Sequence, residues 1–365
     1  MAGNTANFAL SDFALRAVCP TNRLILDTAA DGSELPGIYV EVKARTLSEL
    51  LAGGDGSVHP AFRVDGLQKS IFIGKFQGTA HNNRIYSLPG EDPRANITLD
   101  TYEQYCKNKG LGHHCITAAE WALLALICKK NGTQPYGNNN YGKDSRETVY
   151  QAIPATVDGD GRTNRVKTGT GPVSWSHDKT LEGIWDLNGN VYEWVAGIRL
   201  VKGELQVIPY NDAAHPDTDT SATSSAWRAI NANATSYNDL FITPNGSGTT
   251  SNSVKLDYVS SHWQWGKTIS SSSDTSRSAA FASTTASGLS DFCMMYLRAM
   301  ALMPEDGDTD YEGDYFWANN AANERWAVRG GDWLNGVQYG VFSLHFNHLR
   351  SSSNAYVGGR PAFYE

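Results

Sequence analysis

The sequence has few charged residues, and the charge that it carries is mostly negative. Lysine, arginine, aspartate and glutamate make up 19% of the 365 residues, and the formal net charge is −8. This balance argues against a basic stripe for nucleic acid, so nucleic acid is not expected as a partner. No apolar run approaches the ~18 residues that span a bilayer, and we expect no membrane insertion.

The first residues also lack the features of a secretory signal peptide. Met1 to Asn4 carry no basic residue, and no apolar stretch of signal-peptide type follows them. We therefore expect no Sec signal. The protein either stays inside its cell or leaves by another route, such as cell lysis or a virion.

Cysteine is scarce, and its spacing disfavours a structural zinc site. The five cysteines are scattered, and no two of them form a CxxC pair. Three of them lie within residues 106–128 and could pair or bind a metal. Buried free thiols are the simpler interpretation. The five residues are Cys19, Cys106, Cys115, Cys128 and Cys293.

The apolar content is ample for a packed core, and it is distributed unevenly. Hydrophobic residues make up 41% of the chain, and all tryptophans lie between Trp121 and Trp333. This shift separates a small β-rich N-terminal segment, residues 1–57, from a main domain, residues 58–365. Short β-type runs at 24–26 and 38–42 and a glycine-rich linker at 53–57 are expected in the N-terminal segment, which is a candidate attachment region.

Two helices are predicted from their capping residues. Thr98 is placed to cap a helix over residues 99–109. Thr117 and Glu120 have capping-box spacing, with apolar residues at helical intervals after them, and Asn131-Gly132 ends the pattern. Residues 186–190 and 191–195 predict a tight turn followed by a strand. From about 200 to 320 the chain is polar and irregular, which predicts a loop-rich insertion with one helix near 292–303.

The last 40 residues have the most informative pattern. Phe342, Leu344 and Phe346 alternate with polar residues, which predicts a half-buried strand with one polar face. Tyrosine, histidine and asparagine recur on that face, and these residue types are favoured at binding surfaces. An ordinary solvated face is the alternative. The candidate binding surface comprises Asp332, Leu334, Asn335, Gln338, Tyr339, His345, Asn347, His348, Asn354 and Tyr356.

Several segments resemble the formylglycine-generating-enzyme-like branch of the C-type lectin fold. They are ITAAEW (116–121), YGN (136–138), GIWDLNGNVYEW (183–194), RGGDW (329–333) and GGRP (358–361), in the order of that family. The resemblance covers about residues 60–365. It implies an α+β C-type lectin fold, here with the large insertion and the small N-terminal segment.

The C-terminal end is most similar to the variable proteins of diversity-generating retroelements, such as phage tropism determinants. In those proteins a variable region runs from an RGG-x-W motif to a G-x-R motif, here about residues 329–360. Adenines of its template, mostly in AAC codons, are randomised. All ten surface residues except Gln338 are of a type reachable from AAC. The resemblance implies ligand binding without catalysis.

The enzymes of this branch need groups that this sequence lacks. No cysteine follows Cys293, so the nucleophile and copper ligands of the formylglycine-generating enzymes are missing. His113 and His114 form the only adjacent histidine pair and lack a facial-triad partner. His345 and His348 could bind a metal incidentally, but surface contacts are the better interpretation.

The resemblance also implies a structural calcium site in the GIWDLNGNVYEW segment. An alternative is that Asp186 caps the turn and Glu193 forms a buried ion pair; no other cofactor is expected. The implied ligands are Asp186, Gly189, Val191 and Glu193.

The sequence thus predicts a receptor-recognition protein with a hypervariable C-terminal surface. Its expected ligand is a host cell-surface protein or glycan, with Tyr339 and Tyr356 as anchors. The N-terminal segment would attach it to virion tail proteins, on a phage tail or at a cell surface, and a trimer is one expected assembly. An enzyme with altered chemistry and a conventional lectin are the alternatives.

Overall fold

The structure is a computed structural model and describes residues 2–149 and 151–365. The structure contains both helices and separate, largely antiparallel sheets, which agrees with the predicted α+β class. No helix within the described ranges is both long and apolar enough to cross a membrane. The α-helices are α1 (Ala2–Val18), α2 (Leu47–Leu50), α3 (Leu99–Lys107), α4 (Ala118–Asn131), α5 (Tyr237–Leu240) and α6 (Asp291–Ala299). The 3-10 turns are Pro60–Phe62, Val173–Trp175, Asp212–Ala214, Phe281–Ser283 and Gly336–Gln338.

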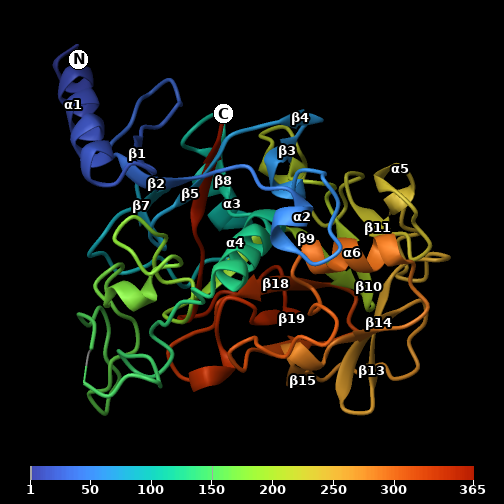
Figure 1. Cartoon of the computed structure of the whole chain (residues 1–365). Helices are drawn as coiled ribbons and strands as arrows, with labels where there is room; N and C mark the ends of the chain where they lie inside the picture. Colours follow the sequence, from blue (N-terminus) through green and yellow to red (C-terminus); the bar gives the residue numbers. More distant parts are fainter. Residues whose placement is uncertain (1, 150) are drawn as a thin grey trace.

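A five-stranded antiparallel sheet joins the two ends of the chain. Its order is β1-β2-β5-β21-β8, so the C-terminal strand lies between β5 and β8 (Figure 1). The predicted domain boundary after Ser57 falls between β2 and β5, which pair with each other. Residues 1–57 therefore share this sheet with the rest of the chain. The strands are β1 (Asn22–Ile25), β2 (Gly37–Val42), β5 (Ile71–Gly74), β8 (His113–Cys115) and β21 (Pro361–Tyr364).

A second, twelve-stranded sheet contains most of the remaining strands. Its main path is β15-β17-β19-β18-β9-β10-β13-β14-β16. Beside it, β11 and β12 pair with each other, β11 also pairs with β10, and β20 pairs with β9. The strands are β9 (Tyr192–Val201), β10 (Glu204–Val207), β11 (Arg228–Ile230), β12 (Phe241–Ile242), β13 (Lys255–Val259), β14 (His262–Gly266), β15 (Arg277–Ala280), β16 (Thr285–Ala286), β17 (Tyr315–Ala318), β18 (Arg325–Arg329), β19 (Leu344–His348) and β20 (Val357–Gly358). Two hairpins stand apart, β3 (Arg63–Val64) with β4 (Leu67–Gln68) and β6 (Gly78–His81) with β7 (Arg84–Ser87).

The two capped helices form as expected. The Thr98 hydroxyl accepts the amide hydrogen of Thr101 at the start of α3. Thr117 and Glu120 form a reciprocal capping box at the start of α4, and Gly132 ends that helix in the left-handed conformation. Helix α4 lies in the middle of the molecule and is buried along most of its length (Figure 1). It belongs to the same hydrophobic core as the inner faces of both sheets.

Much of region 200–320 consists of loops and turns, but the region also supplies many strands of the large sheet, which the sequence did not indicate. Eight of its segments are strands, β10 to β17, and all of them join the large sheet. Trp263 and Trp265 on β14 are fully buried in the main core. The β13–β14 hairpin turns at Ser260 and Ser261, which have φ angles of 48° and 64°. Two-residue hairpin turns of this kind usually have the sequence Asn-Gly, so two serines at these positions gave no sequence signal for a hairpin. Of the regular elements in this region, the sequence predicted the helix near 292–303, which corresponds to α6 (Asp291–Ala299).

The N-terminal segment differs from its prediction in two respects. The expected strands at 24–26 and 38–42 correspond to β1 and β2, but residues 2–18 form helix α1, at one edge of the molecule (Figure 1). The expected linker at 53–57 is an ordered turn. It is held by two main-chain hydrogen bonds, from the amide of Leu47 to the carbonyl oxygen of Ser57 and from the amide of Ser48 to that of Asp55. A side chain at Gly54 would meet the carbonyl oxygen of Leu47 at 2.3 Å, so this turn requires glycine.

Candidate ligand-binding recess

A recess of about 440 Å³ lies where β9, β17 and β19 meet the loops of the C-terminal segment. All of the predicted surface residues except Asn354 line it. Tyr192 on β9 and Trp317 on β17 complete the lining. We call this cavity the C-terminal recess. Its lining residues are Tyr192, Trp317, Asp332, Leu334, Asn335, Gln338, Tyr339, His345, Asn347, His348 and Tyr356.

Two glycines of the RGGDW segment shape one wall of the recess. Gly330 and Gly331 both have φ of 84°, a conformation that glycine adopts at little cost. A side chain at Gly331 would meet the Cβ of Tyr339 at 2.3 Å. The turn therefore lets the chain double back, so that Asp332 and Tyr339 face the same cavity.

The opposite wall is the polar face of β19. Phe342, Leu344 and Phe346 are buried in the main core, as the alternation predicts. The expectation that the other face points into water was wrong. His345 is only 4% exposed and His348 only 9%, because β9 and the loop after β18 enclose that face. Leu334 and Asn335 remain exposed at the rim.

Tyr192 forms the centre of an aromatic cluster in the recess. Its ring centroid lies 5.2 Å from that of Tyr339, 4.7 Å from His345 and 6.2 Å from Tyr356. Trp317 stacks on His345 at 5.8 Å. Sequence reasoning missed Tyr192 and Trp317 as site residues because both lie outside residues 329–360. Tyr192 was expected only in a strand, and Trp317 fell in the supposed insertion.

Burial controls the charge of the recess. Loss of hydration lowers the pKa of His348 to about 4 and that of His345 well below its usual value. Both imidazoles are therefore neutral at neutral pH. Burial also raises the pKa of Asp332 to about 6. His345 Nε2 lies 3.3 Å from the Tyr192 hydroxyl oxygen. Among the residues that the structure describes, no three His, Cys, Asp or Glu side chains cluster in a way that could hold a metal ion.

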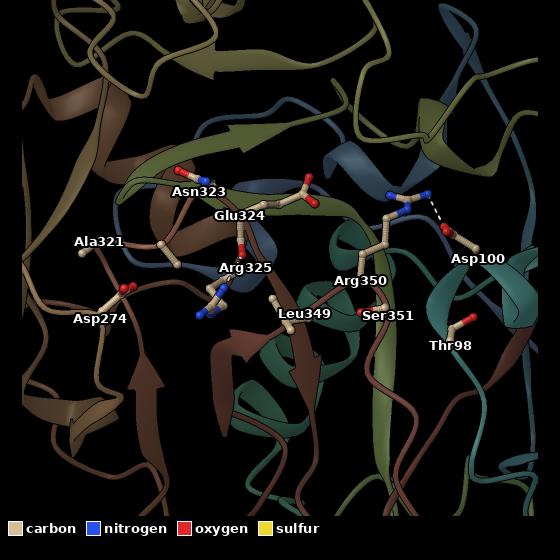
Figure 2. Close-up of a pocket in the computed structure, with 11 residues that line it drawn as sticks. Thr98, Asp100, Asp274, Ala321, Asn323, Glu324, Arg325, Leu349, Arg350 and Ser351 are labelled. Atoms are coloured by element: carbon tan, nitrogen blue, oxygen red, sulfur yellow. Dashed lines mark hydrogen bonds and ion pairs between the residues drawn. The ribbon is translucent and has the colours of Figure 1, made fainter.

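A larger groove, of about 660 Å³, is lined in part by Leu349 and Arg350 (Figure 2). These residues directly follow His348 of the recess in the sequence. Arg350 pairs with Asp100 on one side of the groove, as the dashed line in Figure 2 marks. Its guanidinium also lies 4.4 Å from the centre of the Trp326 ring. These contacts hold Arg350 in the protein framework. Asn354, the remaining predicted surface residue, lies outside both linings and accepts the Asn96 amide hydrogen through its carbonyl oxygen.

The segments that carry the family resemblance meet in the interior. The amide of Gly189 donates to the carbonyl of Gly330 at 2.7 Å, and the amide of Asn190 donates to that of Asn138. Arg360 of the GGRP segment holds Glu193 through Nε and Nη2, at 3.0 and 2.7 Å. Neither side chain of this ion pair is accessible to solvent. The recess is thus built on a rigid, buried base.

The four implied calcium ligands converge, but on a nitrogen atom. Gln77 Nε2 lies 3.2, 3.4 and 3.1 Å from the main-chain oxygens of Asp186, Gly189 and Val191. It lies 3.0 Å from Glu193 Oε1. The amide group of Gln77 therefore takes the position that a cation bound by these four oxygens would need.

The residues in this arrangement do not fit a calcium ion. Calcium requires oxygens at about 2.3–2.6 Å and a net negative site. Here the oxygens surround a hydrogen-bond donor, and the Glu193 carboxylate is already neutralised by Arg360. Asp186 turns its side chain away to accept the Gly169 amide hydrogen. Glu193 thus forms the buried ion pair that was the alternative interpretation.

The other side chains that could react or bind a metal, the cysteines and the His113–His114 pair, make structural contacts in the interior. The five cysteines are buried and free, as expected, and burial raises the pKa of Cys106, Cys115, Cys128 and Cys293. His113 Nε2 contacts the Leu26 carbonyl oxygen, and His114 Nε2 contacts Glu120 Oε1 at 2.9 Å. None of these residues lines the recess. The described lining therefore offers a surface for contacts and no activated thiol.

Fold and site together define a buried base that supports a concave, aromatic-rich surface. No protein-family model matches the chain, and no curated protein matches it. Among solved structures, one titled "Major Tropism Determinant P3c Variant" is similar with a TM-score of 0.29 and 11% sequence identity. The match covers 94% of this chain and 72% of that one. At this TM-score the similarity does not establish a common fold.

Proposed function

We propose that the protein is a non-catalytic receptor-recognition protein whose ligand enters the C-terminal recess. The proposal includes a C-type lectin fold of the formylglycine-generating-enzyme-like branch and a C-terminal region, 329–360, diversified by a retroelement. The observation that carries it is the lining of the recess. Nine of the ten residues that the sequence predicts as a variable surface line this one cavity. They include Asp332 and Tyr356, which are 24 positions apart in the sequence.

The division between framework and lining supports this proposal. Arg329 is buried and donates to the carbonyls of Met300 and Ala301. Trp333 packs against Ala95 and Val191. These contacts hold the backbone on both sides of Asp332, whose side chain lines the recess. None of the lining residues belongs to the main core that contains α4, which favours a site whose side chains are repeatedly exchanged.

Two alternative functions receive less support. An enzyme of this branch with altered chemistry is one alternative, and the cysteine thiol that the formylglycine-generating enzymes use is missing from the described lining. A conventional lectin that binds its sugar through calcium would need a cation site, and the described residues contain no cluster of three His, Cys, Asp or Glu that could hold a metal. We propose a host cell-surface protein or glycan as the ligand. We also propose a location on a phage tail or cell surface, with residues 1–57 as the attachment segment and a trimer as one candidate assembly.

Sequencing the DNA on both sides of the gene tests the proposal directly. We expect a near-copy of the region that encodes residues 329–360, differing at adenines, together with a reverse-transcriptase gene. The codons at 332, 334, 335, 339, 345, 347, 348, 354 and 356 should be reachable from AAC. Codons that adenine substitution cannot reach would refute the proposal. Assays of metal content and oxidase activity would then test the enzyme alternative.

A further inference from the structure

The recess contains a single carboxylate without a cationic partner. The side chain of Asp332 accepts one hydrogen bond, from the amide of Leu334 at 3.1 Å. The residue is 4% exposed. No lysine or arginine stands among the described residues that line the recess. A buried carboxylate that is not neutralised by a cation is costly, and this cost falls when a positive charge approaches it.

Aromatic residues line the same recess as the carboxylate. Tyr339 follows the turn that carries Asp332, and its ring meets that of Tyr192 edge-on at 5.2 Å. Tyr356 meets Tyr192 edge-on at 6.2 Å, and Asn335 donates to the Tyr339 hydroxyl. Ring faces carry negative electrostatic potential and attract cations within about 6 Å. The rings and the carboxylate therefore favour the same sign of charge.

The other titratable groups of the recess do not supply that charge. His345 and His348 are neutral at neutral pH, because burial lowers their pKa values. Burial raises the pKa values of Tyr192 and Tyr339, so their hydroxyls stay protonated. Arg325 lines the larger groove and not the recess. At neutral pH the lining has one negative charge and no positive one.

We propose that the C-terminal recess binds a cationic side chain of a protein ligand, an alkylammonium or guanidinium group, against Asp332 and the tyrosine rings. A cavity of about 440 Å³ is within the range of small-molecule sites and admits one such group. An anionic or purely apolar group would leave the carboxylate without a partner. This inference rests on the proposed function and specifies the ligand of the same site.

Small probes test the inference without knowledge of the natural ligand. The cationic probes are the N-acetyl methylamides of arginine and lysine. Their uncharged counterparts are the same derivatives of citrulline and norleucine. Binding to the full chain is measured by isothermal titration or by shifts of NMR signals. We expect saturable binding of at least one cationic probe, about 10- to 100-fold tighter than its uncharged counterpart.

A matched pair of variants assigns the effect to one carboxylate. Asp332→Asn keeps the size of the side chain and the oxygen that Leu334 contacts, and it should weaken cationic binding about 10-fold or more. Asp274→Asn removes the same charge from the larger groove and should leave binding unchanged. If Asp332→Asn does not fold, the comparison of charged and uncharged probes on the native chain still decides the question.

The outcomes separate this inference from the proposed function. Equal binding of charged and uncharged probes, or no binding of either cationic probe, overturns the inference. So does an equal loss in both variants. A near-copy of the 329–360 coding region in the flanking DNA would leave the proposed function standing in each of these cases. Codons unreachable from AAC would overturn the proposed function and leave the probe result as it is.

Discussion

Replacing Gln77 with alanine should destabilise the protein strongly and should not make it dependent on calcium. The side-chain nitrogen of Gln77 is shared among four buried oxygens, at 3.0 to 3.4 Å. Its oxygen accepts a hydrogen bond from Asn190 at 2.9 Å. The substitution removes all of these bonds at once and opens a small cavity between the GIWDLNGNVYEW segment and β5.

The size of the effect can be worked from these contacts. The amide has two donor hydrogens and one acceptor engaged, and each buried group left without a partner costs about 1–3 kcal/mol. Glu193 keeps its bonds to Arg360, so the loss falls mainly on the main-chain oxygens and Asn190. We expect Gln77→Ala to lower the free energy of unfolding by about 3–5 kcal/mol. An unfolding entropy of about 2.1 cal/mol/K per residue gives about 0.8 kcal/mol/K for 365 residues, and therefore a lower Tm by about 4–6 °C.

Calorimetry at a fixed scan rate measures both parts of this prediction. The Tm of the native chain should be the same in EDTA and in millimolar calcium, and calcium should not restore the Tm of Gln77→Ala. The control is Gln68→Ala, because Gln68 is exposed on β4 and should change the Tm by less than about 1 °C. A lower Tm of the native chain in EDTA would refute the reasoning. So would a Gln77→Ala variant as stable as Gln68→Ala.

Three further predictions concern the buried base and the recess. Arg360→Met should lower the free energy of unfolding by about 3–5 kcal/mol, because it leaves the buried Glu193 carboxylate without its cationic partner. Arg162→Met, in an exposed ion pair, should cost far less, and equal losses would contradict this reasoning. Binding of the cationic probe should weaken about tenfold from pH 7 to pH 5, because Asp332 takes up a proton as the pH falls through about 6; a flat titration profile would exclude this role. Tyr192→Leu should weaken probe binding about tenfold and Tyr192→Phe only slightly, and equal binding by both variants would show that the ring is not used.

Local signals in the sequence were sufficient for part of the fold. Thr98 and Thr117 predicted the starts of α3 and α4, and Gly132 the end of α4. The alternation around Leu344 predicted the inward face of β19. These features depend on residues a few positions apart, and the energies of caps and of amphipathic patterns are set within that distance. The β13–β14 hairpin was missed because its turn, at Ser260 and Ser261, lacks the usual asparagine and glycine.

The sequence by itself determined which residues could form a site, and the tertiary structure decided what surrounds them. Residue types and spacing placed Asp332, Tyr339 and His345 in one candidate surface. Only the folded chain brings Tyr192 from β9 to the centre of that surface and buries it. Likewise, Gln77 lies 116 positions before Glu193 and fills the centre of the expected calcium site. Contacts of this range depend on how the strands pair and pack, and such pairing is specified by the whole core rather than by any local pattern.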